Sequence, residues 1–267
     1  MENRLTKNEK CLISDFIKIE KKEIAYFLGL LWSDGYIRKN TNSIGIECIT
    51  EDMNIFISIL DRIAIWNRYD RQRKDKQPVT NITLSSEKLH KFLADNDYHE
   101  KSIKSPDKII SKIPEYLIKY FLLGIVDGDG CFYFNNEKYL RQFSITGSFN
   151  QDWIGFEKIF IKLRIKYSII RIKTKKTGYS QLRITEASEI LKFGNFIYST
   201  FHEEQIGLPR KYIKYEDIVS NYIKDSLIKE EAFKLYSLGK SAKKIMIALN
   251  IKRATTYNYI KEFKKII

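Results

Sequence analysis

Two aspartates that each precede a glycine are the residues of this sequence best suited to chemistry. Asp34 in LGLLWSDGYI and Asp129 in LLGIVDGDGCF each end an apolar run with helical spacing. Because a helix C-terminus carries partial negative charge, a carboxylate there is unfavourable unless a cation compensates it. Two such carboxylates held together would bind a hard divalent cation, Mg²⁺ or another such as Mn²⁺, with waters and phosphate oxygens completing the shell.

The occurrence of the Asp-Gly pair in an internal repeat favours a functional role for the two aspartates, because a single Asp-Gly pair is usually only a turn. EIAYFLGLLWSDGYI (23–37) and LIKYFLLGIVDGDGCFYF (117–134) share one plan, and Asp34 and Asp129 lie 95 residues apart. The stretch DGDG (127–130) also looks like part of an EF-hand loop, but the later ligand positions of such a loop do not follow.

The correspondence between the two halves continues downstream. TEDMNIFISIL (50–60) matches NQDWIGFEKIF (150–160), and NITLSSEKLHKF (81–92) matches QLRITEASEILKF (181–193). Runs of period 3.6 alternate with runs of period 2, which predicts helix, two strands, helix, two strands and helix in each half. The sequence therefore predicts two copies of one α+β unit.

Small residues recur every fourth position in the two apolar helices. Ala25, Gly29 and Ser33 form such a stripe in the first helix, and Gly124 and Gly128 in the second. Small stripes let two helix backbones approach closely, here around a pseudo-two-fold axis. We therefore expect the helices to pack through these stripes, so that the two candidate metal ligands emerge side by side.

The residues around the two aspartates have separate expected roles. Gly35 and Gly130 should stand just past the helix ends in a left-handed conformation that turns the chain into the first strand. Asp127 lies on the last turn of its helix, where we expect it to support the helix interface or the cap. The first copy keeps only the second aspartate, in WSDG, which favours Asp129 as the ligand.

Composition indicates a globular protein with a polyanionic partner. The chain has 43% hydrophobic residues, and 47 Lys and Arg against 33 Asp and Glu give a net charge of +14. This balance favours nucleic acid before membrane. Cys11, Cys48 and Cys131 lie far apart and suggest neither a disulfide framework nor a zinc site. No apolar run reaches membrane-spanning length, so we expect a cytoplasmic protein.

GLLWSDG and LLGIVDGDG resemble the two signature helices of the LAGLIDADG homing endonucleases, in the monomeric form that carries both copies in one chain. The resemblance covers roughly residues 20 to 220 and departs from the family pattern at Trp32, where an acidic residue is frequent. It implies metal-dependent hydrolysis of both strands of a long, asymmetric, specific DNA duplex. Asp34 and Asp129 match the metal-binding positions of the family.

The expected fold class is α+β. The resemblance implies two pseudo-two-fold-related αββαββα units with saddle-like antiparallel sheets, followed by a small all-α helix-turn-helix domain. The predicted boundaries are 1–116 for the first repeat, 117–222 for the second and 223–267 for the helix-turn-helix domain.

Phosphodiester hydrolysis also requires charge stabilisation near the metal, and in the family a lysine from each half often supplies it. HEKSIK (99–104) corresponds in position to PRKYIK (209–214), which indicates Lys101 and Lys211. Lys112 in SKIPEYL is a rival for the first, because related intein-type proteins carry Lys-x-Ile-Pro at a similar place. In so basic a chain, a solvated surface charge remains the alternative for any lysine.

DNA contacts are expected on the polar faces of the strands. In YSIIRIKTKKTGYSQLRIT, alternation places Ile170 and Ile172 on one face and basic side chains on the other. Arg and Gln can read base edges, whereas Lys mostly contacts phosphates. A solvated face is the alternative. The candidate residues are Arg71, Arg73, Asn81, Thr83, Arg141, Arg171, Lys173, Lys175, Gln181 and Arg183.

The last segment resembles a resolvase-like helix-turn-helix, with SAKKIMIAL as the first motif helix and RATTYNYIKEF as the recognition helix. Residues 226–267 contain ten Lys and Arg against three Glu. A generic helical hairpin is the alternative. The expected DNA contacts in the recognition helix are Arg253, Thr255, Thr256 and Tyr257.

These observations favour a site-specific double-strand DNA endonuclease that acts as a monomer and is associated with an intron or mobile element. Two alternatives stay open. WhiA-type transcription regulators join a LAGLIDADG-like domain to a helix-turn-helix without the catalytic carboxylates, and some relatives are RNA maturases. Retention of both Asp34 and Asp129 argues for the enzyme.

Overall fold

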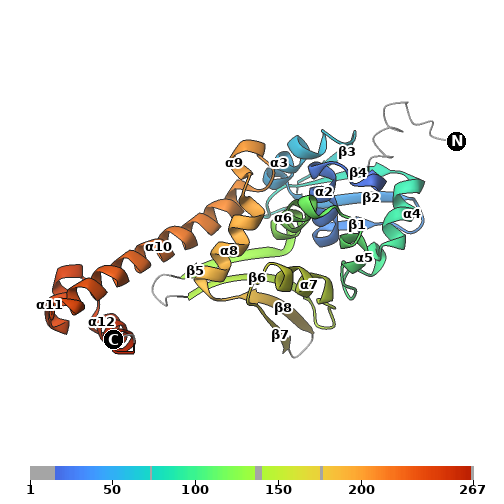
Figure 1. Cartoon of the computed structure of the whole chain (residues 1–267). Helices are drawn as coiled ribbons and strands as arrows, with labels where there is room; N and C mark the ends of the chain where they lie inside the picture. Colours follow the sequence, from blue (N-terminus) through green and yellow to red (C-terminus); the bar gives the residue numbers. More distant parts are fainter. Residues whose placement is uncertain (1–15, 73, 136–139, 175–176, 266–267) are drawn as a thin grey trace. The chain divides into compact units, whose positions relative to one another are not determined.

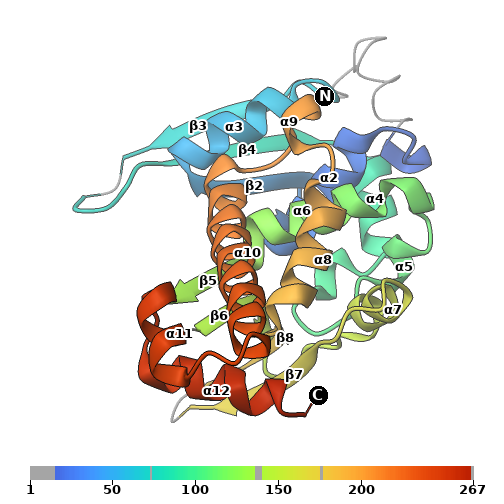
Figure 2. The ribbon, with the colours of Figure 1, turned by 60° about the vertical axis from the view of Figure 1, so that its left-hand side comes forward.

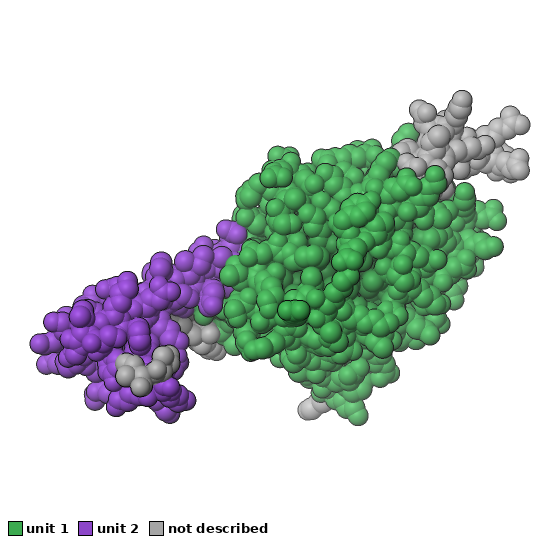
Figure 3. All heavy atoms as spheres, in the orientation of Figure 1, with its two compact units in different colours: residues 1–215 green, residues 216–267 purple. Residues whose placement is uncertain are grey.

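The computed structural model describes residues 16–72, 74–135, 140–174 and 177–265. The chain divides into two compact units, residues 1–215 and residues 216–267 (Figure 3). This division falls within helix α10 (Pro209–Ser237), seven residues before the boundary suggested by the sequence, because one continuous helix joins the two predicted domains. No helix in the described part of the chain is both long and apolar enough to cross a membrane.

The first unit contains the predicted repeat, and each copy follows the order αββαββα (Figure 1). The first copy consists of α2 (Lys22–Ser33), β1 (Gly35–Ile37), β2 (Ser43–Ile49), α3 (Thr50–Leu60), β3 (Asn67–Arg71), β4 (Val79–Ser85) and α4 (Glu87–Asp95). The second consists of α6 (Ile118–Asp129), β5 (Gly130–Asn135), β6 (Leu140–Ser148), α7 (Ile154–Lys162), β7 (Ser168–Lys173), β8 (Gly178–Ile184) and α8 (Ala187–Tyr198).

Short helical segments connect and follow the two copies. They are the 3-10 turns Tyr98–Glu100 and Glu115–Leu117, helix α5 (Asp107–Ile110) and helix α9 (Phe201–Glu204). Each copy forms one antiparallel sheet, in the order β1-β2-β4-β3 and β5-β6-β8-β7. The matching strand orders confirm the α+β class and the internal repeat.

Helices α2 and α6 lie side by side at the centre of the first unit (Figure 2). Both are apolar all round, and every residue from Ile24 to Trp32 and from Tyr120 to Asp127 is buried, as expected for a helix enclosed on all sides. A Cβ on Gly29 would stand 2.0 Å from the Phe121 carbonyl oxygen, and one on Gly124 would stand 2.2 Å from the Tyr26 carbonyl oxygen. The small stripes therefore bring the two backbones into contact, as predicted.

The predicted left-handed conformation of Gly35 and Gly130 is wrong. Gly130 has φ −75° and ψ 144°, and Gly35 begins β1 without a positive φ. Glycine is required here for space, because a Cβ on Gly35 would stand 2.6 Å from the Leu31 oxygen and one on Gly130 would stand 2.6 Å from the Val126 oxygen. Each strand starts so close to the preceding helical turn that no side chain fits.

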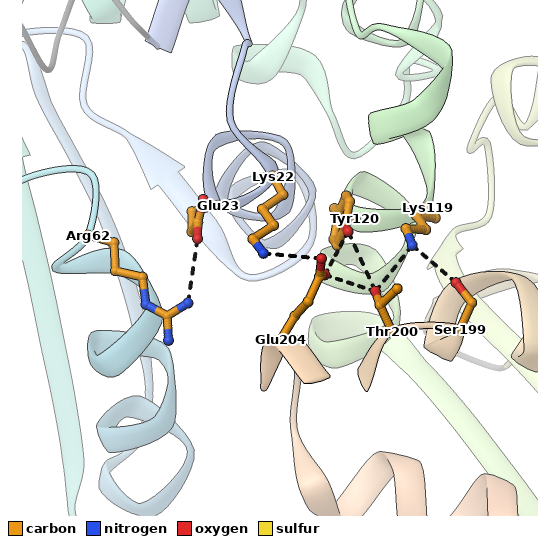
Figure 4. Close-up of polar contacts among 8 residues, drawn as sticks. All are labelled: Lys22, Glu23, Arg62, Lys119, Tyr120, Ser199, Thr200 and Glu204. Atoms are coloured by element: carbon orange, nitrogen blue, oxygen red, sulfur yellow. Dashed lines mark hydrogen bonds and ion pairs between the residues drawn. The ribbon is translucent and has the colours of Figure 1, made fainter. Parts of the chain in front are cut away.

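The opposite ends of α2 and α6 are tied to α9 by a polar cluster around Glu204 (Figure 4). The Glu204 carboxylate accepts hydrogen bonds from Tyr120 Oη at 2.6 Å and Thr200 Oγ1 at 2.8 Å, and pairs with Lys22 Nζ at 3.1 Å. Lys119 Nζ donates to Thr200 Oγ1 at 3.1 Å. These contacts fix the starts of both helices, so that their C-terminal ends can carry the candidate site.

The second unit is a small helical module with its own core. After the end of α10 it contains α11 (Ala242–Leu249) and α12 (Arg253–Phe263), joined by Asn250 at φ 50°. Ser241 caps α11 by accepting from the Lys244 N–H. The buried residues of the core are Ala232, Ile245 and Phe263. The two helices lie in the segments predicted for the motif helices, and Gly239 has a positive φ of 72° before α11.

Candidate metal centre and nucleic-acid interface

The two aspartates of the signature motifs lie at the adjoining ends of α2 and α6. Asp34 is the C-cap residue of α2, and Asp129 is the last residue of α6. The Asp34 Oδ2 atom stands 3.2 Å from the position that a Cβ on Gly128 would occupy, so its carboxylate lies against the chain directly before Asp129. Both residues keep exposed surface. The helix pair therefore presents two carboxylates together at one accessible point.

The electrostatics of this point favour a cation. Burial raises the pKa of Asp34 above its usual value, although Lys101 and Lys211 oppose the shift. Burial, and then the neighbouring Asp34 carboxylate, raise the pKa of Asp129 to about 6. Two partly desolvated carboxylates that repel each other are stabilised when a positive ion lies between them.

Lys101 is one cation that the structure places here. Its Nζ donates to the carbonyl oxygens of Leu31 at 3.1 Å, Ser33 at 2.6 Å and Gly35 at 2.5 Å. Burial lowers its pKa to about 8, against the effect of Asp129 and Asp34. The ammonium group thus compensates the negative end of α2. Its rival Lys112 is exposed in the turn after α5, so the structure brings Lys101 to the aspartates.

Lys211 is the corresponding cation of the second copy. Its Nζ donates to the carbonyl oxygen of Gly130, the residue directly after Asp129. Burial lowers the pKa of Lys211, and the Arg210 guanidinium lowers it further. A lysine ammonium group therefore lies beside each aspartate, as expected from the positions of the two lysines in the repeat.

A cavity of about 260 Å³ opens beside Asp129 and Lys101. Ser102, Thr146 and Gln151 supply polar groups to its wall. Within the described ranges, no group of three or more His, Cys, Asp and Glu side chains could enclose a metal ion. Two solvent-exposed carboxylates fit Mg²⁺, which keeps several waters and takes only one or two protein carboxylates.

Asp127 lies inside the helix interface, as the sequence suggested. The residue is 2% exposed, and its Oδ2 accepts from Tyr26 Oη at 2.7 Å and from the Leu208 N–H at 3.0 Å. No described residue donates to its Oδ1. Burial raises its pKa to about 7 even though both hydrogen bonds oppose the shift. Asp127 thus connects α6 to α2 and to the start of α10.

Asp127→Asn is expected to change the pH dependence of folding. The folded pKa of about 7 exceeds the unfolded value of about 4. Protonation of Asp127 therefore stabilises the protein fully below pH 4, and this contribution, roughly 4 kcal/mol, is lost as the pH rises to 7. The variant should show a flatter Tm between pH 4 and 7 and a higher Tm at pH 8 without added metal.

Asp127→Leu provides the matched comparison for that measurement. It removes the carboxyl group but leaves Tyr26 Oη and the Leu208 N–H without an acceptor. We expect a lower free energy of unfolding by about 2–4 kcal/mol, because buried donors without acceptors are unfavourable. A Tm for Asp127→Asn that fell with pH as steeply as in the unsubstituted protein would contradict the role of Asp127.

An ion pair that sequence reasoning missed, between the exposed Arg210 and the buried Asp52, holds the start of α10. Arg210 Nε donates to Asp52 Oδ1 at 2.8 Å, and its Nη2 donates to Asp52 Oδ2. Asp52 is 5% exposed on α3. The pair links the two copies directly beside Lys211. Its residues are separated by 158 positions, and an acid in the first turn of a helix otherwise indicates only a favourable helix end.

The sheet of the first copy presents the predicted polar face. Arg71, Asn81 and Thr83 lie on the same face, because Tyr69 pairs with Asn81 and Asn67 pairs with Thr83. Arg71 Nη2 contacts Glu47 at 2.8 Å, and Tyr36 Oη donates to Asn81 at 3.1 Å. Arg73 lies outside the described residues.

In the second sheet, the prediction that the basic side chains of β7 lie on the polar face with Gln181 and Arg183 is wrong. Ile170 pairs with Gln181, and Arg171 pairs with the buried Ser180. Because directly paired residues share a face, Ile170 and Ile172 lie on the outer face with Gln181 and Arg183. Arg171 lies on the opposite face, where it donates to the carbonyl oxygens of Phe149 and Gln151 at 3.2 Å.

Lys173 and Arg141 also lie on that opposite face. Lys173 follows Arg171 by two positions and stands over the Phe149 ring at 5.6 Å. Arg141 pairs with Phe134 in the register that also pairs the buried Phe132 and Phe143, and its guanidinium stands 5.4 Å from the Phe134 ring. These three basic residues are therefore not on the face that carries Gln181 and Arg183. Lys175 lies outside the described residues.

The predicted contact surface of α12 needs one correction. Thr256 is 1% exposed, and its Oγ1 donates to the Lys252 carbonyl oxygen. It lies on the same face of α12 as Phe263, which belongs to the core of the module. Arg253 and Tyr257 are exposed, with the guanidinium 5.6 Å from the ring, and Thr255 is half-buried.

No family model and no curated protein sequence matches this chain. Among solved structures, the chain is similar to the homing endonuclease I-WcaI bound to its DNA recognition sequence, with 18% identity over 80% of this chain and 95% of that chain, at a TM-score of 0.53. Full-length WhiA from Thermatoga maritima gives 15% identity, coverage of 97% and 96%, and a TM-score of 0.47. The LAGLIDADG meganuclease I-AabMI bound to uncleaved DNA gives 14%, coverage of 78% and 92%, and 0.48.

The likeness to I-WcaI concerns the fold. It spans nearly all of that protein and most of this chain. The element order, the paired signature helices and the two four-stranded sheets are thus those of the LAGLIDADG homing endonuclease fold, as the sequence resemblance implied.

Proposed function

We propose that this chain is a site-specific DNA endonuclease that hydrolyses phosphodiester bonds in both strands of a long asymmetric duplex with Mg²⁺ or another divalent cation such as Mn²⁺. One observation carries the proposal. Asp34 and Asp129 stand together at the adjoining ends of α2 and α6, and a lysine donates to the carbonyl oxygen of the residue after each of them. A structural cap would need neither the second carboxylate nor the second lysine.

Asp34 and Asp129 are the residues that would hold the cation. When bound, it would act as a Lewis acid on a phosphate oxygen and lower the pKa of a water. Lys101 and Lys211 keep positive charge beside the carboxylates, where charge develops on the phosphate during hydrolysis. The exposed surface of both aspartates leaves room for the backbone of a nucleic acid.

DNA would bind along the outer faces of the two sheets. The first sheet offers Arg71, Asn81 and Thr83, which suit polar base edges and phosphates. The second offers Gln181 and Arg183 beside Ile170 and Ile172, and such apolar side chains suit the methyl group of thymine. Two unlike faces in one chain fit an asymmetric site and a protein that acts as a monomer. An association with an intron or mobile element is part of the same proposal.

The test is incubation of the full chain with Mg²⁺ and duplex DNA from the regions that flank its own gene, joined as they would be without the gene. We expect one double-strand break in the joined DNA, which EDTA prevents. Specific binding without cleavage would overturn the endonuclease proposal and favour a non-cleaving DNA-binding regulator. Binding of the intron RNA in preference to duplex DNA would favour a maturase.

The second unit is proposed as an additional DNA contact. Arg253 and Tyr257 are exposed on α12, and Lys243 and Lys244 are exposed at the start of α11. Of the three acids in residues 226–267, two pair with lysines of α10, as Glu262 contacts Lys229 and Glu231 contacts Lys234. The surplus positive charge therefore lies on α11 and α12, where it would bind phosphates and lengthen the recognised site.

Arg253→Ala is expected to weaken DNA binding by the full chain about tenfold, because a base-edge or phosphate contact contributes roughly 1–3 kcal/mol. Lys234→Ala is the matched control, since this residue is also basic and exposed but lies on α10 and pairs with Glu231. Fluorescence anisotropy at several salt concentrations gives the affinity and its salt dependence. Equal losses in the two variants would argue against a specific surface on α12.

A further inference from the structure

The two lysines beside the aspartates differ in the number of acceptors that they contact. Lys101 Nζ donates to three carbonyl oxygens, those of Leu31, Ser33 and Gly35. Lys211 Nζ donates only to the Gly130 carbonyl oxygen among the described residues. Gly35 and Gly130 occupy corresponding places in the repeat, so the first contact is shared and the other two belong to the first copy alone.

This difference determines which ammonium group has N–H donors available for a phosphate oxygen. A lysine ammonium has three N–H donors and no acceptor. All three donors of Lys101 are engaged by the end of α2, so a phosphate oxygen could contact it only by displacing a carbonyl. Lys211 keeps two donors for an oxygen outside the protein. Phosphate groups take such charge-assisted hydrogen bonds strongly.

Besides the Gly130 contact, the surroundings of Lys211 hold its backbone and not its side chain. The Leu208 N–H donates to Asp127, and Arg210 pairs with Asp52, so the chain is fixed on both sides of the turn into α10. The first copy lacks both of these contacts, because Glu100 stands in the place of Arg210 and Trp32 stands in the place of Asp127. The second copy therefore fixes Lys211 while using only one of its three donors.

The side chain of Lys101, in contrast, determines where Asp34 lies. Its acceptors Ser33 and Gly35 are the two neighbours of Asp34 in the chain. A bridge across both neighbours holds the backbone of Asp34, and hence its carboxylate, in one place. The Tyr98 Oη that donates to the Leu28 carbonyl oxygen at 2.9 Å anchors the segment that delivers Lys101.

We propose that the two halves of the site are unequal, with Lys211 contacting a scissile phosphate directly and Lys101 acting as a positioning residue for Asp34. This inference rests on the proposed endonuclease function. It assigns the phosphodiester of a DNA strand as the ligand of Lys211. The two strands should therefore depend differently on the two lysines.

The test compares Lys211→Met with Lys101→Met on a duplex that the unsubstituted protein cleaves, with a different dye on each strand. Lys211→Met should lower the cleavage rate of one strand at least about 100-fold, as expected for loss of one donor to a developing charge, while Tm changes by less than about 2 °C. Lys101→Met should lower Tm by more than about 5 °C, slow both strands alike and raise the Mg²⁺ concentration for half-maximal cleavage.

The outcomes distinguish failure of the endonuclease function from failure of the unequal roles of the two lysines. Absence of cleavage by the unsubstituted protein would overturn the endonuclease function and this inference with it. Cleavage of both strands by the unsubstituted protein, with each lysine variant losing one strand at unchanged Tm and unchanged Mg²⁺ requirement, would overturn this inference alone. A folded Lys101→Met variant that needs more Mg²⁺ supports positioning, because a role confined to fold stability would change Tm without changing the Mg²⁺ requirement.

Discussion

Asp129→Asn is expected to abolish DNA cleavage in Mg²⁺ while leaving DNA binding intact. The amide keeps the size of the side chain but removes the negative charge that a divalent cation requires. We expect the cleavage rate to fall by about three orders of magnitude or more, since loss of the cation removes most of the stabilisation of charge at the phosphate. Strand-specific cleavage rates and binding affinity in Ca²⁺ measure the two effects separately.

The same variant should be more stable than the unsubstituted protein when no metal is present. Burial and Asp34 raise the pKa of Asp129 to about 6, so ionisation at pH 8 destabilises the folded state. Asn does not ionise, and we therefore expect a higher Tm at pH 8, with a smaller rise on addition of Mg²⁺. Asp61→Asn, at an exposed carboxylate after α3, should change neither cleavage nor Tm. Undiminished cleavage by Asp129→Asn would exclude the carboxylate pair as the metal site.

The helix pair could be predicted from the sequence because its signal is local and occurs twice. Gly29 and Gly124 stand at matching places in two apolar runs, and close packing is the main explanation for small residues at that spacing. The conformation of Gly35 and Gly130 could not be predicted in the same way. A glycine after a helix serves equally for a positive φ or for close approach, and only the path of the next strand distinguishes these possibilities.

Within the second sheet, the face on which each residue lies was predictable for β8 and not for β7. In β8, buried Leu182 and Ile184 alternate with Gln181 and Arg183, and burial fixes the register. In β7, Ile170 and Ile172 alternate with Arg171 and Lys173, which favours a core face for the isoleucines. The strand stands at the edge of the sheet, where the basic side chains reach solvent past the loop at Phe149.

The lysines of the site were predictable by position in the repeat, but their inequality was not. The repeat indicated Lys101 and the Lys-x-Ile-Pro pattern indicated Lys112, and only the path of the chain after α4 decides between them. The pair between Asp52 and Arg210 joins the two copies over 158 positions. Such pairs follow from the packed fold rather than from any local pattern.

Gly29→Ala and Gly124→Ala are each expected to destabilise the protein by about 3 kcal/mol or more. A Cβ at Gly29 would stand 2.0 Å from the Phe121 carbonyl oxygen, and one at Gly124 would stand 2.2 Å from the Tyr26 oxygen. The obstructing atoms are backbone atoms of the partner helix, so the helices must separate to admit a methyl group. Overpacking of a core by a single group often costs 1–3 kcal/mol, and a rigid backbone neighbour places these sites at or above that range.

The expected loss of stability is opposite in sign to the effect of helix propensity alone, so the sign of the measured change distinguishes the two. Replacement of glycine by alanine in a helix interior favours folding by about 1 kcal/mol when the methyl group has space. Ala25→Gly, in the same helix, measures that term with the opposite sign and adds no atom. Urea unfolding of the three variants gives their free energies of unfolding. A gain in stability for Gly29→Ala would show that α2 and α6 do not touch there.

Separation of the helices should also affect the proposed metal site. Asp34 and Asp129 belong to different helices, and the Gly128 backbone stands against the Asp34 carboxylate. A shift of α2 from α6 changes the separation of the two carboxylates directly, and hard cations such as Mg²⁺ demand near-ideal geometry. We therefore expect any Gly124→Ala protein that folds to need more Mg²⁺ for cleavage of both strands. An unchanged Mg²⁺ requirement in a folded variant would mean that the carboxylates are held by the helix ends and not by the close approach of the helices.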